Sequence, residues 1–328
     1  MQHINFDQKK KVHFIGIGGI SMSGIAQVLL SRGFEVSGSD SRASELTRQL
    51  EQEGAVIYIG QRADNIAPDT QIVVYTAAIP QDNPELMRAE ELGIPCVTRA
   101  EFLGQMMKNY ETAICVAGTH GKTTTTSLLT QIMLEADTDP TIMVGGILPA
   151  IHGNTRIGAS GHFVTEACEY TNSFLSFFPT IAVILNVKED HMDFFRDLDD
   201  IRNSFRRFAH LLKPDGVLVI YGSIDDLPYF TDGLEASVLT FGLTSECMYR
   251  AENIICQDNA CPGFDLIVKN QYAGHVQLKI PGEHNVLNAL AAIAAADAAG
   301  IAPELSIKAV GLFQGVDRRF QYKGTIGG

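Results

Sequence analysis

The sequence predicts an α/β protein made of two parallel-sheet domains in series. Short apolar runs alternate with helix-compatible segments along most of the 328 residues, which is the pattern of repeated βαβ units. Two of the apolar runs end in glycine-rich turns, one beginning at Gly16 and one at Gly118, and a helix-compatible segment follows each. Such turns are typical of nucleotide-binding α/β domains. We therefore expect one domain at residues 1–107, a second at 108–321, and the start of a linker at 322–328.

Composition and charge restrict the classes of partner. Hydrophobic residues make up 45% of the chain and charged residues 19%, as in ordinary globular proteins. A formal net charge of −13 argues against a surface for nucleic acid or anionic lipid. Apolar segments fall short of the about 20 residues that span a membrane, and the polar start of the chain does not resemble a signal peptide. Six scattered cysteines without metal-type spacing fit reduced thiols in the cytoplasm.

The first domain opens with a strand at residues 11–15 that runs into Gly-Ile-Gly-Gly-Ile-Ser-Met-Ser-Gly at residues 16–24. A helix is expected at residues 25–32. The turn is of the dinucleotide-binding type, but Ser21 stands where the usual G-x-G-x-x-G pattern has its third glycine. Taken alone, this turn is therefore a weak signal.

Asp40 follows the second strand, at residues 35–39. Its carboxylate is placed to accept hydrogen bonds from a ribose or a base, or else to cap a helix that begins near Ser44. The rest of the domain completes a five-stranded, doubly wound, Rossmann-like sheet. The remaining expected elements are strands at 56–59 and 72–75, a helix at 84–92 and a strand at 95–97.

The second glycine turn reads as a phosphate-binding loop. It follows the apolar run 113–117 and has the sequence Gly-Thr-His-Gly-Lys-Thr-Thr at residues 118–124. Glycines let backbone N–H groups point at phosphate oxygens, while Lys122 reaches the outer phosphates and the Thr123 hydroxyl a Mg²⁺ ion. The spacing departs from the common Walker pattern, because Gly118 is only three positions before Gly121. An ordinary glycine-rich turn before the expected helix at 127–136 is the alternative.

Two further strand ends carry side chains suited to a metal. The strand at 162–165 runs into Glu166, and the strand at 181–185 leads to Asp-His-Met-Asp at residues 190–193. Parallel strands present their carboxyl ends at one edge of a sheet, so we expect Glu166 and His191 beside Lys122 and Thr123. Hard oxygen ligands and a neutral imidazole suit Mg²⁺ sites near phosphates. A surface carboxylate and a helix-entry histidine are the alternatives.

The C-terminal third has two polar clusters among regular elements. His284, Asn285 and Asn288 lie within one turn at the start of an Ala-rich helix at 286–299, where they read an adenine edge or simply cap the helix. Two arginines at 318–319 either clamp phosphate through paired hydrogen bonds or are solvated. The other expected elements are a strand at 141–144, a helix at 201–212, a strand at 216–221 and short antiparallel strands at 237–280.

In this order and at these separations, the motifs resemble those of the Mur ligase family. They are the phosphate loop at 118–124, Glu166, Asp-His-Met-Asp at 190–193, Gly-Glu-His-Asn-Val-Leu-Asn at 282–288 and Gly-Val-Asp-Arg-Arg-Phe at 315–320. The glycine turn at 16–24, Ser-Gly-Ser-Asp at 37–40 and His120 in the phosphate loop point to the alanine-adding members. Essentially the whole chain is covered.

The resemblance implies an ATP-dependent ligase that joins L-alanine to UDP-N-acetylmuramate through an acyl phosphate, in peptidoglycan precursor synthesis. ATP is a co-substrate, and two Mg²⁺ ions are held through Thr123, Glu166 and His191. The implied catalytic residues are Lys122, Glu166, His191 and Arg319. ATP contacts fall on Gly118, Thr119, His120, Gly121, Lys122, Thr123, Thr124, His284, Asn285 and Asn288. UDP-substrate contacts fall on Gly18, Gly19, Ile20, Asp40, Thr76, Ala77, Ile79 and His120.

The sequence also departs from the family pattern. The family has a third, C-terminal domain, whereas this sequence stops at Gly328, so we expect substrate binding but little or no turnover. In the family, further acidic residues often follow the position of Glu166, whereas this chain has Cys168 and Glu169 there. Of these residues we therefore predict only Glu166 as a metal ligand. Ligases that add later residues use a modified lysine downstream of the histidine motif, and here none lies between His191 and Leu212.

Three alternatives remain open. The recycling ligase of the same family attaches a whole tripeptide to UDP-N-acetylmuramate. A nicotinamide oxidoreductase would use the turn at Gly16 but would leave the Lys122 loop unexplained. A non-catalytic module that binds a UDP-sugar or a nucleotide is the third.

Overall fold

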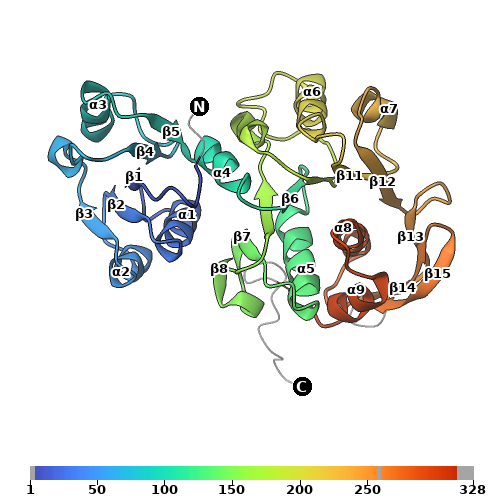
Figure 1. Ribbon diagram of the computed structural model, residues 1–328. Coiled ribbons are helices and arrows are strands. Elements are labelled where there is room, and N and C mark those ends of the chain that lie inside the picture. Colours follow the sequence, from blue (N-terminus) through green and yellow to red (C-terminus); the bar gives the residue numbers. More distant parts are fainter. Residues whose placement is uncertain (1–3, 257–259, 316–328) are drawn as a thin grey trace, which may run out of the picture. The chain divides into compact units, whose positions relative to one another are not determined.

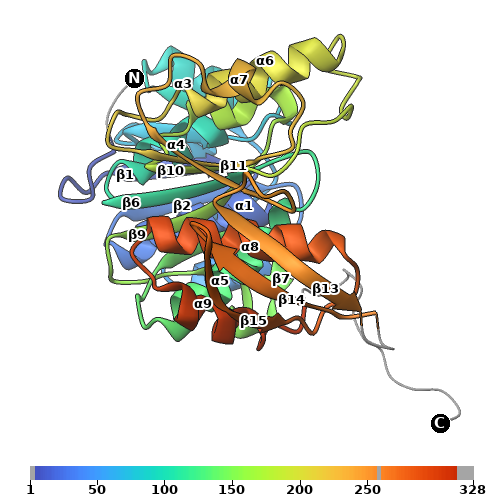
Figure 2. The same ribbon diagram turned by 90° about the vertical axis from the view of Figure 1, so that its right-hand side faces the viewer.

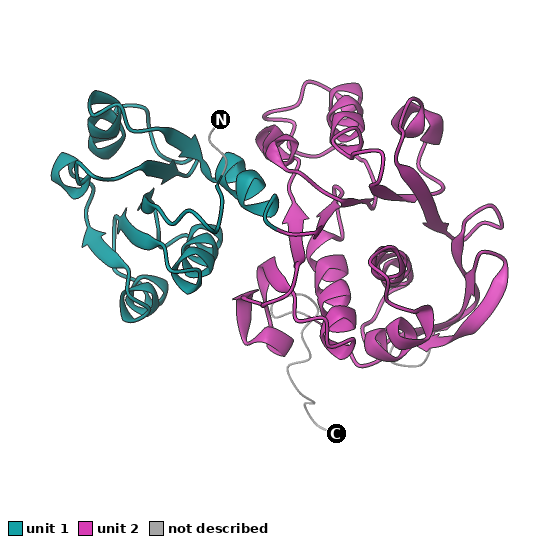
Figure 3. Cartoon of the chain, viewed as in Figure 1, with its two compact units in different colours: residues 1–109 teal, residues 110–328 magenta. Residues whose placement is uncertain are grey.

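The computed structural model describes residues 4–256 and 260–315. The chain forms two compact units, Met1–Asn109 and Tyr110–Gly328 (Figure 3). Each unit has its own sheet, and each is described by itself.

Unit 1 is a doubly wound sheet of five parallel strands in the order β3-β2-β1-β4-β5. Helices α1, α2 and α4 lie on one face of this sheet, where Phe102 of α4 packs on Phe14 of β1, and α3 covers the other face (Figure 1). The strands are β1 (Lys11–Ile15), β2 (Glu35–Asp40), β3 (Val56–Ile59), β4 (Ile72–Tyr75) and β5 (Cys96–Thr98). The helices are α1 (Ile20–Ser31), α2 (Glu45–Gln52), α3 (Pro84–Glu91), α4 (Arg99–Met107) and the 3₁₀ helix η1 (Ala63–Asn65). The predicted five-stranded doubly wound sheet is confirmed.

Local signals start three of these helices. Ser44 accepts a hydrogen bond from the Thr47 N–H in a capping box before α2, and Thr98 forms the same box with Glu101 before α4. Before α3, the Asn83 side chain accepts from two backbone N–H groups, and a proline occupies the first helical position. Each device satisfies backbone donors that a helix start leaves without an intrahelical partner.

The chain winds one way from β1 to β3 and the other way from β4 to β5, so the strand order reverses between β1 and β4. Ligands of open α/β sheets bind beyond the carboxyl ends of the strands at such a point. Gly16 follows β1 with a φ of +86°, and a Cβ built on it would lie 3.0 Å from the Thr76 methyl group, which follows β4. The glycine turn and the Thr76 loop therefore meet at the switch point.

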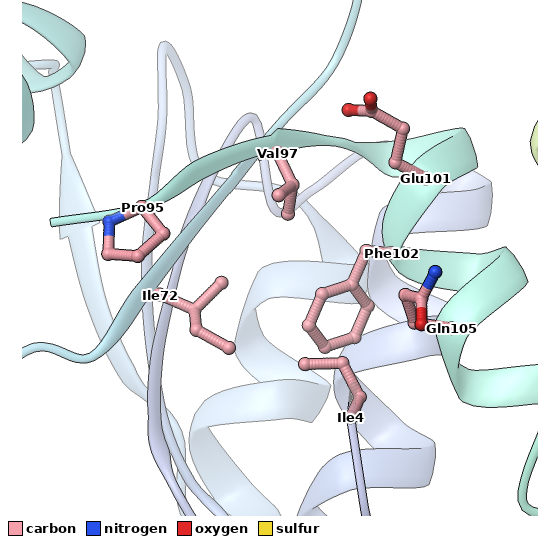
Figure 4. A pocket seen from close by; sticks show the side chains of 7 residues that line it. All are labelled: Ile4, Ile72, Pro95, Val97, Glu101, Phe102 and Gln105. Atoms are coloured by element: carbon pink, nitrogen blue, oxygen red, sulfur yellow. The ribbon is translucent and has the colours of Figure 1, made fainter. Parts of the chain in front are cut away.

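A small apolar pocket of about 110 Å³ opens elsewhere in unit 1. Figure 4 shows Ile4, Ile72 and Phe102 converging on it, while the Glu101 carboxylate points away. Because Ile72 begins β4 whereas Thr76 follows its carboxyl end, this pocket lies at the opposite end of the strand from the glycine turn. Its walls are Ile4, Ile72, Pro95, Val97, Glu101, Phe102 and Gln105.

Unit 2 holds a mixed sheet in the order β15-β14-β13-β12-β11-β10-β6-β9-β7-β8. Helices α5, α8 and α9 lie on one face, with α6 and α7 on the other (Figures 1 and 2). The strands are β6 (Thr112–Ala117), β7 (Thr141–Leu148), β8 (Gly153–Arg156), β9 (His162–Ala167), β10 (Ile181–Ile184), β11 (Val217–Tyr221), β12 (Ser237–Gly242), β13 (Tyr249–Cys256), β14 (Pro262–Val268) and β15 (Gln271–Gln277). The helices are α5 (Lys122–Glu135), α6 (Leu198–Ala209), α7 (Leu227–Thr231), α8 (His284–Ala298), α9 (Pro303–Val310) and the 3₁₀ segments η2 (Pro149–Ile151) and η3 (Tyr170–Ser176).

The predicted antiparallel extension is confirmed for β13 to β15, because β14 pairs antiparallel with both β13 and β15. It is wrong for β12, which pairs parallel with both β11 and β13. The Ala-rich helix is α8, and its small side chains pack in the largest core of the unit, where Ala289 and Ala296 are fully buried. Small residues let a helix approach its neighbours closely, so that α8 packs against both α5 and the sheet.

Two predicted helix starts are wrong. Helix α1 begins at Ile20 rather than at residue 25, and α5 begins at Lys122 rather than at residue 127. The segments that were missed contain serine, glycine and β-branched threonine, which are poor helix formers in isolation. Burial overrides that preference, since Ser23 and Gly24 in α1 and Thr125 in α5 are buried. Helix α6 is also displaced from the predicted 201–212 to Leu198–Ala209, because Asp197 caps it.

Candidate functional site

The phosphate loop is a tight strand-to-helix turn that requires both of its glycines. Gly118 and Gly121 have φ angles of +147° and +90°, which L residues with a Cβ rarely adopt. A Cβ on Gly118 would lie 2.8 Å from the Leu185 Cβ, and one on Gly121 would lie 2.5 Å from the Asn288 Oδ1. The loop is thus packed against Leu185, which follows β10, and against α8, and it delivers Lys122 as the first residue of α5.

The segment after β10 fixes this loop. The Asn186 Oδ1 accepts from the His120 N–H and the Asn186 Nδ2 donates to the His120 carbonyl, each at 2.9 Å. The Thr119 N–H donates to the Asn186 carbonyl at 3.1 Å, and the Thr119 hydroxyl accepts from the Lys188 N–H at 2.9 Å. We did not predict Asn186 as a functional residue. Its signal in the sequence is an amide placed directly after a buried strand.

The expected meeting of strand ends is confirmed. Strand β6 pairs parallel with β9 on one side and with β10 on the other. The Thr123 hydroxyl donates to the Glu166 Oε2 at 3.0 Å, and the Glu166 Oε1 accepts from the Gly145 N–H at 2.5 Å. A hydroxyl from the phosphate loop and a carboxylate from the neighbouring strand therefore lie side by side.

Lys122 is paired with a carboxylate that the sequence analysis set aside. Its ammonium lies 2.8 Å from the Glu169 Oε2 and 3.1 Å from the Oε1, and it donates to the Gly118 carbonyl at 2.6 Å. The Glu169 side chain is only 2% exposed. The His191 Nε2 lies 4.0 Å from the Glu169 Oε1, so the carboxylate of Glu169 is close to both Lys122 and His191.

The oxygen-rich groups here fit a divalent cation. Glu169, Asp190 and His191 each offer a ligand atom, and these atoms lie within 4.8 Å of one another. Thr123 and Glu166 supply a second pair of hard oxygen donors, which is the donor type that Mg²⁺ prefers. The chemistry of both groups suits the two Mg²⁺ ions that were predicted, and Glu169 and Asp190 are candidate ligands that the sequence analysis did not include.

His191 sits in a constrained segment. Its φ is +54°, and its ring packs on Tyr170 with 4.7 Å between ring centroids. The Tyr170 hydroxyl donates to Asp193 at 2.8 Å, and this hydrogen bond raises the pKa of the phenol. The Asp-His-Met-Asp segment is thereby held against η3, and it does not enter a helix directly, because α6 begins only at Leu198.

The two asparagines predicted to contact adenine are buried in bonds within the chain. The Asn288 Nδ2 donates to the Asn285 Oδ1 at 2.9 Å, and the Asn285 Nδ2 donates to the Pro281 carbonyl at 2.8 Å. The Asn288 Oδ1 accepts from the Thr125 hydroxyl at 3.3 Å, which joins α8 to α5. The capping alternative is wrong, because α8 begins at His284 without a side-chain cap. Arg319, the remaining predicted catalytic residue, lies outside the described residues.

The predicted UDP-substrate residues of unit 1 surround the first glycine turn. The Gly16 and Ile17 N–H groups donate to the Ser39 carbonyl at 2.8 and 3.0 Å. The Asp40 Oδ2 accepts from the Gly18 N–H at 2.9 Å. The alternative role of Asp40 as a helix cap is wrong, because Ser44 caps α2.

The other candidates lie around the same turn, except one. Gly19 precedes α1 as its N-cap residue, and Ile20 begins that helix with a side chain that is 54% exposed. Thr76 and Ile79 close a turn after β4, since the Ile79 N–H donates to the Thr76 carbonyl at 3.0 Å; Ala77 lies within it. His120, the exception, is an exposed residue of the phosphate loop in unit 2.

A buried polar network around Glu85 holds Ser39, whose carbonyl binds the first glycine turn. The Ser39 hydroxyl donates to the Glu85 Oε2 at 2.6 Å, and the Asn65 Nδ2 donates to the Glu85 Oε1 at 2.5 Å. The His13 ring faces the same carboxylate at 3.8 Å. Burial alone would raise the pKa of Glu85, but the interactions with His13, Ser39 and Asn65 outweigh it and hold this pKa below its usual value. The carboxylate is therefore kept charged beneath the strand that positions Asp40.

Two further expectations bear on the class of protein. All six cysteines lie within the described residues, and none of them forms a disulfide there. Across residues 4–256 and 260–315, none of the helices combines the length and the apolar character needed to cross a bilayer.

The family models match both units. The Mur ligase family catalytic domain matches residues 11–111, and the Mur ligase middle domain matches residues 116–296. The chain is 50% identical over 328 residues to the UDP-N-acetylmuramate–L-alanine ligase of Agathobacter rectalis, and the match covers 100% of this chain and 72% of that protein.

Solved structures agree. The UDP-N-acetylmuramate-alanine ligase of Thermotoga maritima is 31% identical with a TM-score of 0.81, covering 97% of this chain and 72% of that one. The UDP-N-acetylmuramate:L-alanyl-gamma-D-glutamyl-meso-diaminopimelate ligase of Neisseria meningitides is 30% identical with a TM-score of 0.84, covering 95% of this chain and 100% of that one. With family models that together match most of the sequence and a 50% identical relative, the chain belongs to the Mur ligase family.

Proposed function

We propose that this chain binds the substrates of an ATP-dependent ligase that joins L-alanine to UDP-N-acetylmuramate in peptidoglycan precursor synthesis. The observation that carries the proposal is the gathering of Lys122, Thr123 and Glu166 at the ends of neighbouring parallel strands. Such a gathering suits a triphosphate and its cation. The 50% identity to an alanine ligase supports the choice of amino acid.

The proposed reaction has two steps. A carboxylate oxygen of UDP-N-acetylmuramate attacks the γ-phosphorus of ATP, and the bond from that phosphorus to the β–γ bridging oxygen breaks, releasing ADP and an acyl phosphate. The neutral amine of L-alanine then attacks the acyl carbon, and phosphate leaves with the electrons of the carbon–oxygen bond while the amine loses a proton. The first step brings a carboxylate toward a polyphosphate, and in the second step negative charge develops on the acyl oxygen and the leaving phosphate. Cationic stabilisation is therefore the main task of the protein.

The residues of the phosphate loop serve that task. The Lys122 ammonium offsets charge on the outer phosphates, and the N–H groups at the start of α5 face the same anion. Thr123 and Glu166, and the group containing His191, would hold Mg²⁺, which supplies charge neutralisation at the transferring phosphoryl group. Asn186 holds His120 and Thr119 so that the loop keeps its shape while the charge shifts.

In unit 1, the UDP group is proposed to lie on the turn at Gly18 and Gly19. That turn starts α1 at the switch point of the sheet, and a helix N-terminus favours a diphosphate. Asp40 is held against the turn through the Gly18 N–H, and its carboxylate remains the proposed acceptor for a ribose or base donor.

The proposal is tested by product formation and by binding. The purified protein is mixed with ATP, Mg²⁺ and UDP-N-acetylmuramate, and ADP release is compared with L-alanine, with the tripeptide L-alanyl-γ-D-glutamyl-meso-diaminopimelate, or with neither. We expect both nucleotide substrates to bind and ADP release to be low, and any release to require L-alanine and to yield UDP-N-acetylmuramoyl-L-alanine. Calorimetric titration of each nucleotide substrate is the independent readout. A tripeptide requirement would favour the recycling ligase, and binding of neither nucleotide would refute the proposal.

A further inference from the structure

Glu169, a candidate metal ligand, is a buried carboxylate that is also paired with Lys122. It is 2% exposed, and its two oxygens accept from the Lys122 ammonium at 2.8 and 3.1 Å. The Lys122 side chain is 16% exposed and is bound as well by the carbonyls of Gly118 and Thr119 at 2.6 and 3.3 Å. The lysine is therefore folded back on its own loop, with its charge matched by Glu169.

This pairing competes with nucleotide binding. An ammonium that already donates to Glu169 and to loop carbonyls has to give up some of these bonds before it can bind a phosphate. A buried carboxylate that loses its cationic partner is strongly destabilised. The same contact that stabilises the nucleotide-free loop therefore opposes the entry of ATP.

The surroundings of Glu169 supply a replacement cation. The His191 Nε2 lies 4.0 Å from the Glu169 Oε1, and Asp190 completes a group whose ligand atoms lie within 4.8 Å of one another. A carboxylate released by Lys122 is thus already beside two other potential ligands of a divalent cation.

We infer that Glu169 exchanges partners during the catalytic cycle: it holds Lys122 in the nucleotide-free protein, and ATP takes the lysine while a divalent cation takes the carboxylate. Glu169 is thereby a positioning residue that makes nucleotide and Mg²⁺ bind cooperatively, since each removes a cost of binding the other. The inference rests on the proposed function, because it takes ATP as the ligand of Lys122.

If this exchange occurs, a substitution of Glu169 should strengthen metal-free ATP binding, although most substitutions in a binding site weaken it. Glu169→Gln keeps the shape of the side chain but removes the charge that holds Lys122. When a binding-competent form is only a fraction of the population, the apparent affinity falls by that fraction, so freeing the lysine should tighten metal-free ATP binding by about tenfold. The gain in ATP affinity on adding Mg²⁺ should shrink by a similar factor.

The experiment is calorimetric titration of ATP into the protein, first with a chelator and then with Mg²⁺. Glu169→Gln is compared with wild type and with Glu166→Gln, which removes a charge from the same site but bonds to Thr123 and Gly145. Glu169→Asp is a second variant, because its shorter side chain weakens the contact with Lys122 while keeping the negative charge. Melting temperatures confirm that each variant is folded.

We expect Glu169→Gln to bind metal-free ATP more tightly than wild type, Glu169→Asp to change in the same direction, and Glu166→Gln to gain clearly less. An equal gain in Glu166→Gln would mean general relief of charge repulsion and would overturn the exchange. Unchanged or weaker metal-free binding in both folded Glu169 variants would overturn it as well. Failure of the wild-type protein to bind ATP with Mg²⁺ would instead refute the proposed function.

Discussion

Asn186 and His120 are joined by a reciprocal pair of hydrogen bonds, in which the amide of Asn186 both donates to and accepts from the backbone of His120 at 2.9 Å. The Asn186 side chain, which follows β10, thus satisfies the backbone N–H and carbonyl groups in the middle of the phosphate loop, as a neighbouring strand would in a sheet. This pair explains how a loop with only two residues between its glycines keeps one shape.

The first prediction concerns that pair. Asn186→Ala should weaken Mg²⁺-ATP binding by about tenfold, because each lost hydrogen bond is worth about 1 kcal/mol and the loop becomes mobile. Asn186→Asp keeps the acceptor for the His120 N–H but loses the donor, so its loss should be smaller. Calorimetric titration measures both. Equal affinities for wild type and Asn186→Ala would show that the loop does not need this support.

A second prediction concerns backbone strain at Gly121. Gly121→Ala should lower stability by about 1 to 3 kcal/mol and abolish ATP binding, because φ is +90° and a Cβ would lie 2.5 Å from the Asn288 Oδ1. Gly300 is a matched control, since its φ is +89° with nothing within 4 Å of a Cβ. Gly300→Ala carries the strain without the clash, so urea unfolding should show the smaller loss there. The same loss at both positions would rule out a contribution from Asn288.

The sequence predicted part of this site and missed another part. Most of the strands, though not β8, were predicted, as were the two glycine turns and the convergence of Thr123 with Glu166. Apolar runs and glycine positions are local signals, and parallel strands share an edge. Glu169 was missed because its position depends on η3, where Thr171 and Asn172 adopt φ angles of +55° and +57°. Such a bend after β9 leaves no periodic pattern.

The asparagines of α8 illustrate a different limit. Residue type and spacing suggested that Asn285 and Asn288 face a ligand or cap a helix. In the structure both amides are instead hydrogen-bonded within the chain, to each other, to Thr125 of α5 and to the Pro281 carbonyl. Which polar groups a fold consumes internally depends on tertiary contacts that the sequence does not display.

A third prediction concerns the buried carboxylate of unit 1. Glu85→Ala should cost about 2 to 4 kcal/mol, because Ser39 and Asn65 lose their acceptor inside the core. The folded-state pKa of Glu85 is lower than its unfolded value. Its contribution to stability is therefore present above the unfolded pKa, near pH 4.5, and is lost as pH falls through the folded pKa.

The pH dependence separates charge from shape. In Glu85→Gln the group no longer titrates, so the free energy of unfolding, measured by urea titration from pH 3 to 7, should fall less steeply on the acid side than in wild type. An unchanged acid-side slope would mean that Glu85 is not charged in the folded protein.

A fourth prediction tests the UDP site without disturbing the fold. A Cβ on Gly19 would meet no atom closer than 3.5 Å, which is an ordinary contact, so Gly19→Ala should leave the melting temperature unchanged. The added methyl group would lie on the turn proposed to hold the UDP group. It should weaken UDP-N-acetylmuramate binding by about tenfold, because the ligand could no longer approach the backbone of the turn closely. Binding of Mg²⁺-ATP serves as the internal control. Unchanged affinity for the UDP substrate would place that ligand elsewhere.

The account rests on a division of tasks: the turn at Gly18 holds the UDP-sugar, and the loop at Lys122 holds the triphosphate. Calorimetric titration of UDP-N-acetylmuramate and of Mg²⁺-ATP into wild type and a folded Lys122→Ala variant tests this most directly. We predict loss of ATP binding in the variant, with UDP-N-acetylmuramate affinity within about twofold of wild type, because its proposed contacts belong mainly to the other unit. A parallel loss of both affinities would contradict the account.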